Sequence, residues 1–286
     1  MSITGAGRLA GVLGWPIGHS LSPRLHGYWL ERYKIDGAYV PLAVQSEDFA
    51  QALAALPKLG FAGVNVTVPH KEAALDLADS ADAQAQRVGA ANTLVFSEDG
   101  RIEAFNTDGH GFIENLRGNA DLSALAGGPA VVLGAGGAAR SVVAALLDAG
   151  APQVRVVNRT KSRAEALVSD MSDGAANEII PIDWDGRADA LAGAAILVNT
   201  TVLGMAGQAP LELDLGQLPK SAVVNDLVYT PLQTELLKTA ASCGNRTLDG
   251  LGMLLHQARP GFEAWFGIEP EITPALRRFV LAGGLA

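Results

Sequence analysis

The sequence of residues 131–140 is VVLGAGGAAR, a short apolar run followed by glycines and alanines. The apolar run predicts a buried strand, and the small residues predict a tight turn that leads into a helix. The pattern G-x-G-x-x-A is typical of dinucleotide binding. Gly134 permits the turn, Gly136 lets a pyrophosphate approach the backbone, and Ala139 allows close packing of the helix. We therefore predict a dinucleotide-binding domain, with a purely structural turn as the alternative.

The end of the next expected strand distinguishes the two nicotinamide dinucleotides. A domain that binds NAD usually has Asp or Glu there, which holds the ribose hydroxyls. Here Val157 is followed by Asn158, Arg159 and Thr160, and Arg163 lies one helical turn later. A neutral asparagine does not repel a 2′-phosphate, and guanidinium and hydroxyl groups can bind one. We expect NADP as the cofactor; the alternative is a solvated strand end without a ligand.

Strand and helix patterns alternate along both halves of the chain, which predicts parallel βαβ units. We predict two α/β domains, and the sheet of the first is mostly parallel. The first domain is expected at residues 1–107, completed by C-terminal helices at 250–286, and the second at 108–249. Expected strands lie at 8–13, 38–44, 63–66, 130–133, 154–157, 196–199 and 223–226, with a hairpin at 92–96 and 102–105 and helices at 22–33 and 47–59.

Composition excludes several classes of protein. The 286 residues are 49% hydrophobic and 18% charged, which is neither a disordered nor a fibrous composition. The single cysteine, Cys243, excludes a disulfide framework and favours a reducing compartment, so we expect a cytoplasmic protein. A net charge of −9 argues against nucleic-acid binding. The uncharged stretch 122–139 is interrupted by glycines and a proline, so we expect no membrane span.

Polar side chains follow the first expected strand in the segment 14–23. Ser20 and Ser22 are two positions apart, just before a helix, and Ser22 is followed by a proline. The spacing alone favours Ser22 as the N-cap residue of that helix rather than as a ligand-binding residue. His19 and His26 are seven positions apart without a third ligand nearby, so we expect no metal site.

A second polar group follows the third expected strand. Alternation places Asn65 and Thr67 on one face of an extended segment. Lys71 then opens a helix, where the helix dipole disfavours a cation. This position supports a functional lysine and an ordinary surface lysine equally. Because ligands bind at the carboxyl ends of strands in open α/β sheets, these groups together imply a small, hydroxyl-rich ligand. The further members of the group are Asn92, Thr93, Asn106, Thr107 and Asp108.

Eight motifs in order resemble the shikimate/quinate dehydrogenase family, and in particular its NADP-dependent shikimate dehydrogenases, over nearly the whole chain. One departure is that Gly27 follows His26, where the family usually has His-Asn. The motifs are G-x-P-x-x-H-S-x-S-P at 14–23, N-V-T-V-P-x-K at 65–71, A-N-T at 91–93, N-T-D-x-x-G at 106–111, G-A-G-G-A at 134–138, N-R-T at 158–160, D-L-V-Y-T-P at 226–231 and D-G-L-G-M-L at 249–254, with Gln257 three residues later.

The resemblance implies a substrate-binding domain and a Rossmann-type NADP-binding domain with an active-site cleft between them. It implies reversible reduction of 3-dehydroshikimate to shikimate by NADPH, in aromatic amino-acid biosynthesis, with Lys71 and Asp108 as the acid/base pair. By the same resemblance, the substrate carboxylate is bound by Ser20, Ser22 and Tyr229, and the ring hydroxyls are bound by Asn65, Thr67, Asn92, Asp108 and Gln257. The residues that it implies for cofactor binding are Gly134, Ala135, Gly136, Gly137, Ala138, Asn158, Arg159, Thr160, Arg163, Leu227, Gly250 and Met253.

Two alternatives remain at this point. One is a quinate/shikimate dehydrogenase that uses NAD or both cofactors, since it shares the fold and the Lys71–Asp108 pair. The other is a catalytically silent nucleotide-sensing module, against which the retained lysine, aspartate and serines argue. The sequence leaves open whether Asp108 only orients Lys71 or shares its proton. It also leaves open whether the protein is a monomer or a homodimer.

Overall fold

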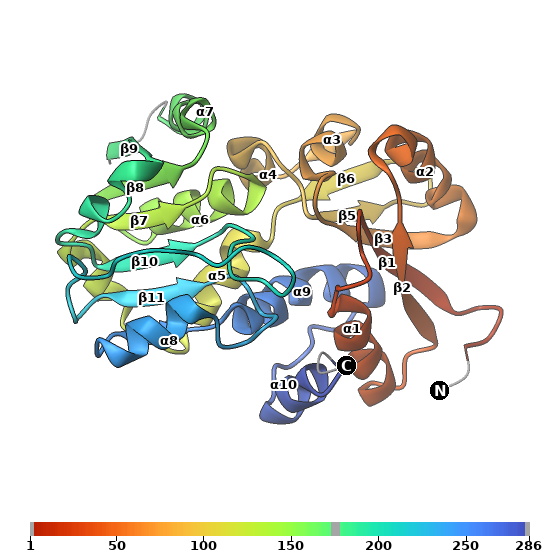
Figure 1. Cartoon of the computed structure of the whole chain (residues 1–286). Helices are drawn as coiled ribbons and strands as arrows, with labels where there is room; N and C mark the ends of the chain where they lie inside the picture. The colour runs from red at the N-terminus through yellow and green to blue at the C-terminus, as the bar shows by residue number, and fades with distance from the viewer. Residues whose placement is uncertain (1–2, 173–177, 284–286) are drawn as a thin grey trace. The chain divides into compact units, whose positions relative to one another are not determined.

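The computed structural model describes residues 3–172 and 178–283, and these form two compact units (Figure 1). Unit 1 extends to Thr107 and resumes at Leu255, while unit 2 comprises Asp108–Leu254. The chain re-enters unit 1 inside helix α9 (Gly250–Phe266), whereas the sequence placed this return at Gly250.

Unit 1 contains a six-stranded mixed sheet with the strand order β2-β1-β3-β5-β6-β4. Strand β1 is parallel to β2 and β3, β4 is parallel to β6, and β5 is antiparallel to β3 and β6, so the expected hairpin and the mostly parallel sheet are confirmed. Its elements are β1 (Arg8–Gly14), α1 (Ser22–Arg32), β2 (Gly37–Ala43), α2 (Phe49–Ala55), β3 (Phe61–Val66), α3 (Lys71–Asp76), β4 (Ser80–Ala81), α4 (Ala83–Val88), β5 (Thr93–Phe96), β6 (Ile102–Phe105) and α10 (Pro274–Leu281).

The prediction of a single long helix at 47–59 is wrong. Helix α2 covers only Phe49–Ala55, with 3₁₀ turns before it at Ser46–Asp48 and after it at Pro57–Leu59. Pro57 has no backbone N–H to continue the ladder of helical hydrogen bonds. Gly60, at a φ of 82°, then turns the chain into β3.

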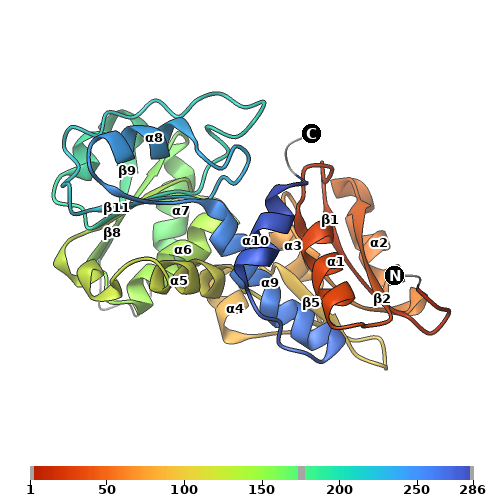
Figure 2. The same ribbon diagram turned by 90° about the horizontal axis from the view of Figure 1, so that it is seen from below.

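The C-terminal part of unit 1 packs on the sheet through large aromatic side chains. The indole Nε1 of Trp265 donates to the carbonyl oxygen of Leu94 at 3.0 Å. A Cβ added at Gly63 would lie 2.1 Å from that nitrogen, so only glycine allows this approach. Helix α10 lies beside α1 in Figure 2.

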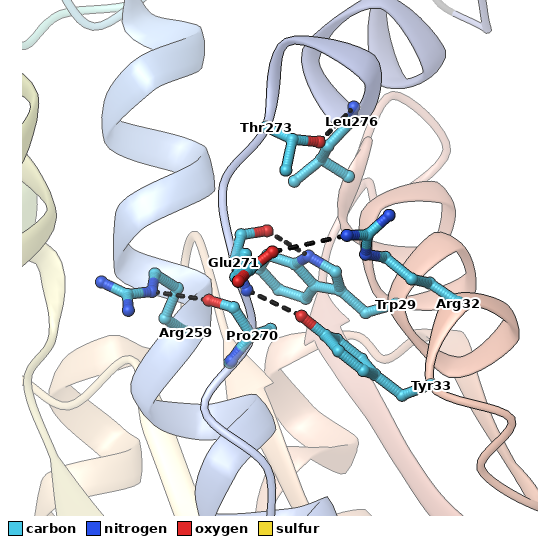
Figure 3. A network of polar contacts seen from close by, with 8 residues as sticks. All are labelled: Trp29, Arg32, Tyr33, Arg259, Pro270, Glu271, Thr273 and Leu276. Atoms are coloured by element: carbon cyan, nitrogen blue, oxygen red, sulfur yellow. Dashed lines mark hydrogen bonds and ion pairs between the residues drawn. The ribbon is translucent and has the colours of Figure 1, made fainter.

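The segment 267–273 between α9 and α10, called the strap below, makes hydrogen bonds to α1 and its end (Figure 3). The carbonyl oxygen of Glu271 accepts the indole N–H of Trp29 at 3.0 Å, and the Glu271 amide donates to the Tyr33 hydroxyl at 2.9 Å. Arg259 donates to the carbonyl oxygen of Pro270 at 2.8 Å. The two bonds of Glu271 hold this segment against α1 and its end, and the bond from Arg259 holds it against α9.

Unit 2 contains a six-stranded, fully parallel sheet with the strand order β12-β11-β10-β7-β8-β9 (Figure 1). This is the Rossmann order, in which the first strand of the unit lies beside the crossover point. Its elements are α5 (Asp108–Arg117), β7 (Ala130–Leu133), α6 (Gly137–Asp148), β8 (Gln153–Asn158), α7 (Lys161–Met171), β9 (Glu178–Asp183), β10 (Ile196–Asn199), β11 (Val223–Asp226), α8 (Glu235–Ser242) and β12 (Arg246–Leu248).

Gly27 tests how local helix propensity contributes to the stability of unit 1. It lies inside α1, and a Cβ added there would meet no heavy atom of the described residues within 4 Å. Because glycine costs about 0.8–1 kcal/mol relative to alanine inside a helix, we expect Gly27→Ala to raise the thermal midpoint by about 2–4 °C.

Gly60→Ala is the matched control, because a φ of 82° disfavours any residue with a Cβ. We expect it to lower the thermal midpoint measured under the same conditions. A Gly27→Ala protein that melts below the wild type would contradict this account of α1.

Candidate active site

Two polar segments of unit 1 lie at the same edge of its sheet. They follow β1 and β3, which are parallel neighbours, so their carboxyl ends coincide. The Trp15 amide donates to the carbonyl oxygen of Val68 at 3.0 Å, and the Thr67 amide donates to that of Leu13 at 2.9 Å. A Cβ added at Gly14 would lie 2.4 Å from Cγ2 of Thr67. The serine segment and the segment around Thr67 therefore lie together.

The expected capping role of Ser22 is wrong. Leu21 is the N-cap residue, and its own side chain makes no capping hydrogen bond. Ser22 is the first helical residue, and it is buried. The Oγ of Ser20 accepts the Ser22 amide at 3.3 Å, so Ser20 takes over part of the capping role. Both serines remain at the carboxyl end of β1, next to the start of a helix.

The expected hydroxyl-binding amides form one buried network within unit 1. The amide nitrogen of Asn65 donates to the carbonyl oxygen of Asn92 at 3.1 Å and to Oγ1 of Thr93 at 3.0 Å. The amide nitrogen of Asn92 donates to Oγ1 of Thr107 at 2.9 Å and to Oε1 of Gln257 at 3.1 Å. The structure thus brings together Asn65, Asn92 and Gln257, which come from three distant parts of the sequence.

Lys71 opens helix α3, as the sequence predicts. The residue before it, His70, is buried, with Nε2 at 2.7 Å from the carbonyl oxygen of Val44 and its ring stacked on Phe49. The amide of Ala91 donates to the carbonyl oxygen of Lys71 at 2.8 Å. These contacts fix the start of α3 close to the segment that carries Asn92.

Asp108 belongs to unit 2, where it is the first residue of α5. It directly follows Thr107, the last residue of unit 1 before the chain leaves it. Its side chain is only 5% exposed. The expected acid/base pair therefore consists of one residue from each unit.

The glycine turn of unit 2 has the features that a dinucleotide requires. Gly134 has a φ of 110°, and a Cβ there would lie 2.4 Å from Oγ1 of Thr200, so only glycine fits. A Cβ added at Gly136 would have no heavy atom of the described residues within 4 Å. Helix α6 starts at Gly137, and in the described part of the chain no side chain caps it. Its amides can therefore bind a pyrophosphate, as the motif predicts.

The end of β8 lies at a cavity of about 300 Å³ within unit 2. The Asn158 amide donates to the carbonyl oxygen of Thr160 at 2.8 Å and shapes the turn after the strand. The residues after the strand, Arg159, Thr160 and Arg163, are exposed, and Arg159 lines the cavity. The cavity is lined by Arg159, Trp184, Arg187, Leu203, Ala209, Pro210 and Glu212.

Sequence reasoning missed Trp184 and Arg187 of this cavity. They follow β9, the edge strand next to β8, which contains Pro181 and was not predicted as a strand. The guanidinium of Arg187 lies 5.2 Å from the centre of the Trp184 ring. A second arginine therefore faces the same cavity as Arg159. The signal available in the sequence was the short apolar run before Trp184.

The last expected cofactor residues surround the turn after β11. The Leu227 amide donates to the carbonyl oxygen of Asn199 at 2.9 Å, and a Cβ at Gly250 would lie 2.1 Å from the carbonyl oxygen of Leu227. Tyr229 is half-buried two residues later, and Met253 is buried in α9.

Asp226 holds the start of this turn. Its carboxylate accepts hydrogen bonds from the Thr234 hydroxyl at 2.7 Å, the Asn199 amide at 2.9 Å and the Val228 backbone at 3.0 Å. Burial raises its pKa, and these bonds oppose the rise. The turn that carries Leu227 and Tyr229 is therefore anchored to the neighbouring strand β10 and to the start of α8.

Within residues 3–172 and 178–283, no three His, Cys, Asp or Glu side chains are grouped so that they could hold a metal ion. Within the same ranges, no helix combines the length and the apolar character that crossing a membrane requires.

Three family models match the chain. They are the shikimate dehydrogenase substrate binding domain over residues 12–94, shikimate / quinate 5-dehydrogenase over 118–202, and the shikimate 5′-dehydrogenase C-terminal domain over 250–277. Together they cover most of both units.

Individual proteins are similar over almost the full length. The shikimate dehydrogenase (NADP(+)) of Rhodospirillum rubrum is 59% identical, across 98% of this chain and 99% of the relative. The solved structure of the Thermus thermophilus shikimate 5-dehydrogenase in complex with NADP(H) and shikimate is 37% identical, with a TM-score of 0.84, across 97% of this chain and 100% of that one. The Corynebacterium glutamicum quinate dehydrogenase in complex with NAD is 33% identical, with a TM-score of 0.87, across 96% of this chain and 99% of that one.

Proposed function

The chain belongs to the shikimate dehydrogenase family, and from this premise we propose that it reversibly reduces 3-dehydroshikimate to shikimate with NADPH. The proposal places the enzyme in the biosynthesis of aromatic amino acids. The observation that carries it is the buried network of Asn65, Asn92 and Gln257, which a small polyhydroxylated ligand fits. Its test is oxidation of shikimate by the purified protein, followed as formation of NADPH.

We assign cofactor binding to unit 2. The glycine turn and the start of α6 suit the pyrophosphate, and Arg159, Thr160 and Arg163 suit the 2′-phosphate. Arg187 faces the same cavity as Arg159 and adds a second cation there. Leu227, Gly250 and Met253 suit the nicotinamide end. When bound, NADPH supplies the hydride, and the protein supplies position and the proton.

We assign substrate binding chiefly to unit 1. The hydroxyls of Ser20 and Ser22 bind the carboxylate together with Tyr229 of unit 2. The side chains of Asn65, Thr67, Asn92 and Gln257 bind the ring hydroxyls. The buried position of three of these side chains excludes water from the hydrogen bonds they make, so each bond discriminates more strongly between ligands.

Lys71 and Asp108 act as the acid/base pair. In ketone reduction a proton must reach the carbonyl oxygen, and Lys71 donates it from its ammonium group. In alcohol oxidation the neutral amine takes that proton back. Asp108 binds a substrate hydroxyl and orients the lysine. Both residues open helices that follow the polar segments of the sequence motifs.

The setting of the enzyme is also part of the proposal. The single Cys243 is exposed and free, which fits a reducing compartment, and we place the enzyme in the cytoplasm. It acts as a monomer or a homodimer on a small-molecule substrate.

A second candidate is a quinate/shikimate dehydrogenase that uses NAD. The similarity to the C. glutamicum quinate dehydrogenase favours it. The arginines at the end of β8 and in its cavity argue for NADP instead, because a carboxylate for the ribose hydroxyls is replaced there by Asn158.

The carboxylate role of the serines predicts a moderate loss in one variant. Ser20→Ala removes one hydroxyl donor, so we expect kcat/KM for shikimate to fall by the equivalent of ~1–2 kcal/mol. We also expect the wild type to prefer shikimate to quinate, because the quinate carboxylate is attached to a tetrahedral carbon. Steady-state kinetics with both substrates measure both effects.

Ser97→Ala is the control for Ser20→Ala, because Ser97 loses its bonds to Asp99 and Arg101 in the hairpin of unit 1. Ser20→Ala also removes the hydrogen bond that Ser20 accepts from the Ser22 amide. The thermal midpoints of both variants measure the effect of that lost bond on stability, separately from the effect on substrate binding. An unchanged shikimate value in Ser20→Ala would be incompatible with the serine clamp.

A further inference from the structure

Tyr39 contacts Asn65, one of the proposed substrate-binding residues, although it lies in none of the motifs. It is the third residue of β2 and is only 7% exposed. Its phenol donates a hydrogen bond to Oδ1 of Asn65 at 2.6 Å, between two buried side chains. A residue of β2 is therefore linked directly to the amide network.

The neighbours of Asn65 fix the direction of these bonds. A backbone carbonyl can only accept, so the amide nitrogen of Asn65 must face the carbonyl oxygen of Asn92, at 3.1 Å. The oxygen Oδ1 must then face Tyr39, and the phenol must donate its single proton to it.

This geometry determines what Asn65 can offer to a ligand. Its two N–H groups are directed at Asn92 and Thr93, and one lone pair of Oδ1 is taken by Tyr39. The second lone pair is the remaining hydrogen-bonding position of the side chain. A ligand hydroxyl bound there must therefore act as the donor.

The ring of Tyr39 is itself rigidly held. It stacks on His26 with the ring centres 3.8 Å apart and the planes 3° from parallel, and Trp265 lies 6.0 Å away. Burial raises the pKa of Tyr39 well above its usual value and lowers that of His26 to about 3. Both rings are therefore uncharged at neutral pH, and the phenol keeps its donor proton.

We propose that Tyr39 is a positioning residue for the substrate, orienting Asn65 through its hydroxyl while its stacked ring keeps that hydroxyl in place. The inference rests on the proposed function, since it assumes that Asn65 binds a ring hydroxyl of the substrate. Tyr39 touches neither substrate nor cofactor in this role. Its contribution lies in removing the rotational freedom of the Asn65 side chain before the substrate arrives.

The variant Tyr39→Phe tests this role because it keeps the stacked ring and removes only the hydroxyl. The variant leaves Oδ1 of Asn65 buried without the donor that Tyr39 supplies. We therefore expect kcat/KM for shikimate to fall about tenfold, chiefly through a higher KM. We expect the KM for NADP to stay at the wild-type value, because the proposed cofactor residues lie in unit 2. Tyr33→Phe is the matched control, since it removes the hydroxyl that accepts the Glu271 amide in the strap.

A double-mutant cycle separates positioning from general stability. In the Asn65→Ala background we expect Tyr39→Phe to lower kcat/KM by less than about twofold, because the bond it removes is already absent. Equal losses in both backgrounds, or a matching rise in the KM for NADP, would overturn the positioning role. So would a Tyr39→Phe enzyme as active as wild type. A wild type that oxidises no shikimate would instead contradict the proposed function itself, and with it this inference.

Discussion

Replacing Lys71 with alanine is expected to lower kcat by ~10²-fold or more while changing the KM for shikimate far less. A positioned acid or base stabilises the transition state more than the bound substrate, so its loss appears mainly in kcat. The structure places Lys71 at the first position of α3, next to the segment that carries Asn92. Steady-state rates of shikimate oxidation with saturating NADP measure the effect.

Lys58→Ala is the control for this variant. Lys58 is an exposed lysine of the same unit in a 3₁₀ turn, so its removal changes the net charge equally. We expect Lys58→Ala to keep the wild-type kcat. If Lys71→Ala retained most of its kcat, Lys71 would not be the proton donor of the reduction.

Replacing Arg159 with alanine is expected to weaken NADP binding about tenfold to a hundredfold and to leave NAD binding nearly unchanged. A charge-assisted hydrogen bond to phosphate contributes roughly 1.5–3 kcal/mol, which corresponds to that range. Arg159 follows β8 and lines the same cavity as Arg187, so it can meet a 2′-phosphate that NAD lacks. Titration of each cofactor against intrinsic fluorescence measures both affinities without turnover.

Lys161→Ala is the matched control for Arg159→Ala. Lys161 is a neighbouring cation that pairs with Asp183 at 3.5 Å and is not part of the cavity lining. We expect its removal to leave the preference for NADP intact. Equal loss of NADP and NAD binding in Arg159→Ala would show that the arginine supports the fold of the turn rather than the 2′-phosphate.

Most strands of both sheets could be predicted because their signal is local. Continuous apolar runs such as Ala130–Leu133 and Ile196–Asn199 are typical of strands buried on both faces, and the structure confirms them. The edge strand β9 was missed because Pro181 interrupts its pattern, and β12 is only three residues long. Edge strands need less apolar sequence, so composition identifies them poorly.

The arrangement of the candidate site could be predicted where neighbouring positions in the sequence determine it. The place of Asn65 in β3 and of Lys71 at the start of α3 was predicted in this way, and the structure confirms both positions. Ser22 was misassigned because α1 begins at Ser22 itself, with Leu21 as the N-cap residue. Tyr39 and Arg187 were missed because their roles depend on contacts across strands, which no local pattern contains.

The measurement that tests the central claim most directly compares two substrates and two cofactors. Shikimate and quinate are each offered to the wild-type enzyme with NADP and with NAD, and formation of the reduced nicotinamide is followed by its absorbance. We predict the highest kcat/KM for shikimate with NADP, and much lower values for the other three combinations. Equal kcat/KM with NADP and NAD, or oxidation of quinate as efficient as that of shikimate, would contradict the account.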